Sequence, residues 1–124
     1  MHKQKKVGDK VLREFEFLKK LAYLRTKEKV VAMVRSATER QLICIAEVAL
    51  NILHRRFSLR KYQLVRLAPF GNDLVSLARV HTPGGVRRVL LKSNDARMVS
   101  SLLLPVISAV GRLKKYGSEV HTSA

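Results

Sequence analysis

A helix-capping motif at residues 38–41 leads directly into a run of mostly apolar residues that extends to about His54. Thr38 and Gln41 have the spacing at which two side chains bond each other's backbone amides at a helix N-terminus. One stripe at helical spacing consists of Leu42, Ile45, Ala46, Ala49, Ile52 and Leu53. Further apolar residues between these widen the stripe almost all the way round, and a helix of that kind is a buried one. The sequence therefore predicts a central helix over about residues 39–54.

Apolar residues at helical spacing recur along the rest of the chain, and no alternating strand pattern of useful length occurs. The residues expected to cap the other helices are Thr26, Ser58, Asn72, Thr82 and Ser93. The segment 86–92 can be helical or extended, because Gly84 and Gly85 weaken its start. Pro105 should kink or interrupt the last helix. We predict an all-α domain of about five or six helices over residues 9–114, between a disordered basic arm (1–8) and a flexible C-terminal tail (115–124).

The chain is strongly basic, with 25 Lys and Arg against 9 Asp and Glu and a formal charge of +16 over 124 residues. Two long stretches contain no acid at all, from Glu47 to Asp73 and from Asp73 to Asp95. Since 47% of the residues are hydrophobic, this charge belongs to a folded body rather than to a disordered polycation. A folded domain with such a surplus usually has a polyanion as its partner.

Metal, cofactor and catalytic sites are not expected. The single cysteine, Cys44, rules out disulfide frameworks and cysteine-based metal sites. The four histidines are isolated in the sequence, and no glycine-rich loop has the spacing of a phosphate-binding motif. Glu47 is the one acid within the central apolar helix, and we expect it to pair with an arginine across the core rather than to act as an acid catalyst. The charged N-terminus and the lack of a long apolar run predict an intracellular protein without membrane contact.

The expected nucleic-acid contacts are cations near helix ends and on short helices, where side chains and backbone amides can meet phosphates together. These residues are Arg55, Arg56, Arg60, Lys61, Arg66, Arg87, Arg88 and Lys92. Aromatic residues among them are few, so stacking on single strands is not expected, and phosphate contact with double-stranded DNA fits best. Two alternatives stay open. One is a solvated basic face without a partner, and the other is a helix-turn-helix over residues 60–80 that reads a specific sequence.

The apolar C-terminal segment has two interpretations. It can be the last core helix, or it can be a peptide-like segment that inserts into a partner protein or perturbs a lipid surface. Its partner-binding candidates are Met98, Leu102, Leu103, Leu104, Val106 and Ile107. Self-association is a further alternative, because the central helix is apolar on most sides.

The order of these elements is similar to that of a family of small basic proteins. The matching segments are Gln41–Leu53, Phe57–Leu59, Leu67–Pro69, Arg87–Leu91 and Leu102–Ile107. Together they resemble proteins encoded by Polinton (Maverick) and adintovirus-type elements, over about residues 30–110. Where that pattern often has lysine-rich tracts and Gly-Gly-Phe before the final apolar segment, this chain has residues 93–96, Ser-Asn-Asp-Ala.

The resemblance implies a non-enzymatic virion component, a basic core or capsid-associated protein found in the virion and in the host nucleus. Double-stranded DNA and capsid proteins are then the expected partners. A capsid cement or scaffold protein, docked through the apolar C-terminal helix, is the alternative from another class. The third hypothesis is a cellular regulator that recognises a specific DNA sequence.

Overall fold

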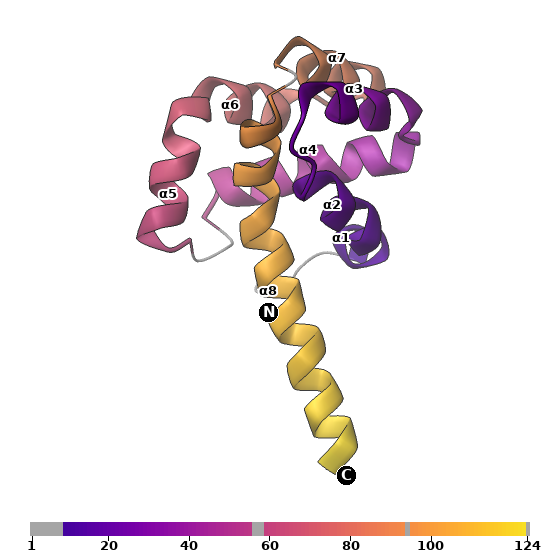
Figure 1. The fold of residues 1–124 in the computed structure, drawn as a ribbon, viewed down its shortest axis with the longest axis vertical. Coiled ribbons are helices and arrows are strands. Elements are labelled where there is room, and N and C mark those ends of the chain that lie inside the picture. Colours follow the sequence, from indigo (N-terminus) through magenta and orange to yellow (C-terminus); the bar gives the residue numbers. More distant parts are fainter. Residues whose placement is uncertain (1–8, 56–58, 94, 124) are drawn as a thin grey trace.

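The computed structural model describes the backbone of residues 9–55, 59–93 and 95–123, and the side chains of residues 10–55, 59–93 and 95–111. All regular structure in these ranges is helical, so the predicted all-α fold is confirmed (Figure 1). The elements are α1 (Asp9–Arg13), α2 (Phe15–Ala22), α3 (Lys27–Ser36), α4 (Glu39–Leu53), α5 (Lys61–Leu67), the 3-10 helix η2 (Ala68–Phe70), α6 (Gly71–Arg79), α7 (Pro83–Ser93) and α8 (Ala96–Ser123). In these ranges the helices outnumber the five or six expected, partly because the N-terminal segment forms two helices, α1 and α2, that are separated at Glu14.

Helix α4 is the centre of the fold, as its composition predicts. The backbone amide of Gln41 donates to Thr38 Oγ1 at 3.1 Å, and the amide of Thr38 donates to Gln41 Oε1 at 2.9 Å. The helix that this motif starts contacts α1, α6, α7 and α8. Most of its apolar side chains are buried, and only its last turn leaves large ones exposed, at Leu50 and Leu53.

Helix α8 closes the core with the apolar segment of the C-terminal region. It packs against α2, α4 and α5, and the last turns of its ribbon project beyond the other helices (Figure 1). Pro105 does not interrupt it. The backbone from Lys115 to Ser123 continues the helix, and the flexibility expected of this tail stays a prediction. The expected basic arm, residues 1–8, lies outside the described residues.

Two of the predicted helix caps are confirmed and others shift. Thr26 Oγ1 accepts a bond from the amide of Lys29 at 3.3 Å, and Thr82 Oγ1 accepts one from the amide of Gly85 at 3.1 Å. Because Thr82 caps α7, the segment 86–92 is helical rather than extended. Helix α6 begins at Gly71, one residue before the expected cap Asn72, since the 3-10 turn before it leads straight into the helix.

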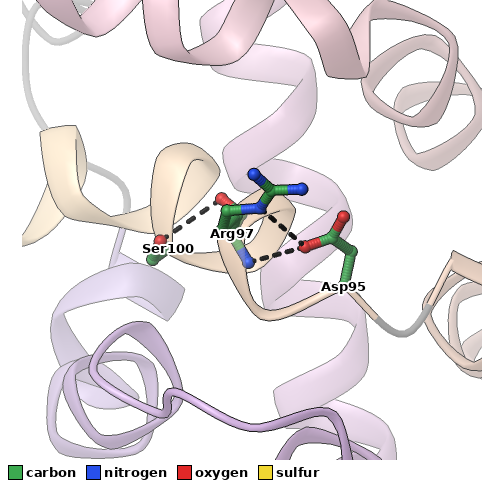
Figure 2. A network of polar contacts seen from close by, with 3 residues as sticks. All are labelled: Asp95, Arg97 and Ser100. Atoms are coloured by element: carbon green, nitrogen blue, oxygen red, sulfur yellow. Dashed lines mark hydrogen bonds and ion pairs between the residues drawn. The ribbon is translucent and has the colours of Figure 1, made fainter.

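The two remaining caps also differ from expectation. Ser58 lies outside the described residues, and Gln63 instead closes the start of α5 by accepting a bond of 2.8 Å from the amide of Arg60. Asp95, rather than Ser93, caps α8, because its Oδ1 accepts a bond of 2.8 Å from the amide of Arg97 (Figure 2).

The prediction that Glu47 pairs with an arginine is wrong. Its Oε1 lies 3.7 Å from Nζ of Lys10 on α1, so the partner is a lysine and not an arginine. The two side chains are 31% and 55% exposed, so the pair lies at the surface of the α1–α4 contact and not within the core. An ion pair with this exposure stabilises the fold little.

Candidate nucleic-acid interface

The charge surplus is concentrated in one half of the folded domain. Residues 9–47 contain nine Lys and Arg and six Asp and Glu, whereas residues 48–94 contain nine Lys and Arg and a single acid, Asp73. The second range includes α5, η2, α6 and α7, each in contact with the next. Figure 1 shows these helices following one another around one side of the molecule. We call them the basic arc.

The described acidic side chains do not neutralise the cations of the basic arc. Within the described side chains, ion pairs shorter than 4.0 Å are formed by Lys10 with Glu47 and by Arg97 with Asp95. Neither pair involves a cation of the arc. The second pair has its Nε and Oδ1 atoms 3.8 Å apart and lies at the start of α8 (Figure 2). The arc therefore presents uncompensated positive charge.

The first group of predicted contacts lies around α5. Arg60 and Lys61 are exposed at the N-terminus of this helix, and Arg66 is exposed in its last turn. The guanidinium carbon of Arg66 lies 5.6 Å from the centre of the Tyr62 ring, within cation–π range. Arg55 is exposed after α4 and has a positive φ of 57°, a conformation rare outside glycine.

The second group lies on α7, and its members differ. Arg88 and Lys92 are exposed and stand one helical turn apart, so they share a face. Arg87 is half-buried, and its guanidinium faces the end of α3 instead of solvent. Its Nη2 donates to the carbonyl of Ala37 at 2.9 Å, and its Nε donates to the carbonyl of Val34 at 3.5 Å. Arg87 therefore ties α7 to the end of α3 and contributes less to an exposed cationic face than its neighbour.

The fold thus places five of the predicted cations in two groups on the arc, with α6 between the groups in chain order. They are Arg60, Lys61 and Arg66 around α5, and Arg88 and Lys92 on α7. Arg79, exposed in the last turn of α6, belongs to the same arc although the sequence prediction omitted it. Arg79 lies in the acid-free stretch between Asp73 and Asp95, and this position is a reason to include it among the predicted nucleic-acid contacts. Arg56 lies outside the described residues.

The six partner-binding candidates of the C-terminal segment belong mostly to the core. Exposure is at most 7% for five of them: Met98, Leu102, Leu103, Val106 and Ile107. Only Leu104 is partly exposed. The interpretation of this segment as the last core helix agrees with its burial, whereas docking would require these side chains to leave the core.

A hollow of about 600 Å³ between α4, α5 and α6 has Arg55 as its one charged residue among the described side chains that line it. No three His, Cys, Asp or Glu side chains in the described ranges lie close enough together to hold a metal ion. No helix in the described part of the chain is both long and apolar enough to cross a bilayer.

Cys44 is buried in the core. Its Sγ donates to the carbonyl of Lys10 at 3.5 Å. Burial raises the pKa of this thiol to about 12, and the negative charges of Glu47 and Glu14 act in the same direction. A thiol held protonated in this way is not a nucleophile.

Comparisons of the chain with protein-family models, with curated proteins and with solved structures gave no match.

Proposed function

We propose that the protein is a non-enzymatic structural protein that binds double-stranded DNA through its phosphates, without sequence preference. The observation that carries this proposal is the basic arc, in which exposed cations on three successive helices have no acidic partner within salt-bridge distance among the described side chains. A surface of this kind attracts a polyanion and gains free energy by releasing the counterions condensed on it. Phosphate contacts do not distinguish bases, so the binding is independent of sequence.

The cellular role in this proposal is that of a basic core or capsid-associated component of a virion. It is supported by the resemblance of the chain to proteins of Polinton and adintovirus-type elements. The cement alternative has less support, because the side chains that would dock to capsid subunits are buried. Deleting residues 98–124 would remove a core helix and would not test docking separately from folding.

The salt dependence of DNA binding tests the proposal. Each phosphate contact adds about 0.9 to the slope of log affinity against log salt concentration. We expect a slope of several units for a short duplex measured by fluorescence anisotropy. A flat response would remove electrostatics as the driving force.

A matched pair of variants separates the effect of the basic arc on DNA binding from the effect of the total charge. The first replaces Arg60, Lys61, Arg88 and Lys92 by Gln, and the second replaces four exposed cations elsewhere by Gln: Arg13, Lys19, Lys20 and Arg40. Both variants lose the same charge. The first should lower the salt slope by about three to four units, and the second by clearly less. Equal losses would mean that net charge, and not the arc, drives binding.

Competition between unrelated duplexes tests sequence independence. We expect competitors of random and of selected sequence to displace the labelled duplex equally. A specific protein typically prefers its site by about 10³-fold or more, and a preference of that size would favour the regulator alternative.

A further inference from the structure

A second, different feature lies beside the basic arc, where α2, α5 and α8 meet. A cavity of about 370 Å³ is lined by Tyr23, Tyr62, Gln63, Arg66, Ser101, Leu104, Pro105, Ile107 and Ser108. Its volume is within the range of small-ligand sites, about 300–1,000 Å³. No acid occurs among these described lining residues.

The two tyrosines are unusual for their exposure. Tyr23 is 61% exposed and Tyr62 is 56% exposed, although aromatic side chains supply much of the buried area in most domains. They stand 39 positions apart in the chain, on the residue after α2 and on α5, and the fold brings both to one cavity. Two exposed aromatic rings in one hollow form a surface on which a flat ring can stack.

The polar groups of the cavity suit a base attached to a phosphate backbone. Arg66 lies against the Tyr62 ring and supplies positive charge at the rim. The amide nitrogen of Gln63 and the hydroxyl of Ser101 offer hydrogen-bonding groups for the edge of a base, while Oε1 of Gln63 already accepts from the amide of Arg60. Arg66 stands one helical turn after Tyr62 and is itself a cation of the basic arc, so a strand bound here contacts that arc as well.

We propose that this cavity binds an unpaired base of single-stranded nucleic acid, stacked on Tyr23 and Tyr62, with Arg66 at the adjacent phosphate. The proposal rests on the proposed function, because the basic arc supplies the attraction to the backbone. It departs from the expectation that stacking on single strands plays no part. That expectation rested on the small number of aromatic residues in the sequence, and the fold places two of them at one cavity.

Intrinsic fluorescence offers a direct test on the unaltered protein. The chain has no Trp and three Tyr, so its emission comes from tyrosines alone. Titration with a short oligothymidylate strand should quench this emission as the bases stack. An abasic strand of equal length has the same phosphates and should bind with much less quenching. Equal quenching by the two strands, or none by either, would overturn the proposal.

Substitutions test the site separately from the basic arc. When an aromatic ring that stacks on one base is removed, the affinity for the strand typically falls by about 5- to 150-fold. We expect Y62L and Y23L each to weaken oligothymidylate binding within this range and to leave duplex binding within about twofold. Y62F keeps the ring and should bind like the unaltered protein.

Val65→Ala is the matched control, because Val65 is 65% exposed on the same helix and does not line the cavity. It should leave binding to both strands unchanged. Thermal unfolding of every variant checks that the fold is intact. If duplex binding keeps its salt slope while neither tyrosine variant affects single strands, the stacking site is wrong and the proposed function stands. If the protein binds neither duplex nor single strand at low salt, both proposals fail.

Discussion

The guanidinium of Arg87 donates a hydrogen bond of 2.9 Å to the backbone carbonyl of Ala37, the residue that follows α3. The last carbonyls of a helix have no partner within it, and a cation near that end also interacts favourably with the helix dipole. Arg87 thus stabilises the junction of α3 and α7, two helices that are far apart in the sequence. Its neighbour Arg88 is exposed and has no ion-pair partner among the described residues.

This relationship predicts different effects for two adjacent arginines. R87Q should lower the free energy of unfolding by about 1–2 kcal/mol, since it removes a partly buried charged donor from two backbone carbonyls. R88Q should leave stability unchanged and lower the salt slope of DNA binding by about 0.9. Urea unfolding and anisotropy titrations measure the two quantities. The assignment is wrong if R88Q destabilises the fold as much as R87Q does.

The two glycines at the start of α7 form a second matched pair. A Cβ on Gly85 would lie 2.5 Å from Cγ1 of Val80 and 3.0 Å from the capping oxygen of Thr82. A Cβ on Gly84 would meet nothing within 4 Å. We expect G85A to cost about 1–3 kcal/mol, because Val80 is β-branched and Thr82 is held by its capping bond.

G84A is the control. It should be neutral or stabilising by up to about 1 kcal/mol, because alanine favours the helix and restricts the unfolded chain. Thermal unfolding of both variants gives the comparison. Equal melting temperatures for G84A and G85A would show that the close contact at Gly85 costs nothing.

Local features of this fold could be predicted from the sequence, because their causes lie within a few residues. The hydrogen bonds between Thr38 and Gln41 join residues three positions apart, and the capping bonds of Thr26 and Thr82 join residues with the same separation. The central position of α4 follows from its composition alone. The basic arc coincides with the acid-free stretches, because the surplus of cations there is a property of the sequence itself.

Features that depend on distant residues could not be predicted in this way. Arg87 and Arg88 are identical in type and adjacent, and only the packing of α7 on α3 decides which of them is used inside the fold. Tyr23 and Tyr62 share a cavity only because α2 and α5 both pack on α8. The lysine partner of Glu47 depends in the same way on where α1 meets α4.

The buried thiol predicts a particular pH dependence. The pKa of Cys44 is raised from 9.0 to about 12 in the folded protein. The contribution of the protonated thiol to stability is therefore complete below pH 9 and is lost as the pH rises toward 12, with a slope of up to about 1.4 kcal/mol per pH unit. C44A removes the titrating group. The difference in unfolding free energy between the unaltered protein and C44A should shrink over this interval, and a difference independent of pH would contradict the prediction.

The apolar segment of α8 has two interpretations that a pair of adjacent leucines can separate. Leu103 is fully buried and Leu104, the next residue, is only partly buried. If the segment is a core helix, L103A should cost about 2–5 kcal/mol, because it removes a buried side chain and leaves a cavity. L104A should cost clearly less, since part of its surface already meets solvent. Denaturant unfolding measures both values. A small cost for L103A, together with loss of association with another protein, would mean that this face of α8 docks to a partner instead of filling the core.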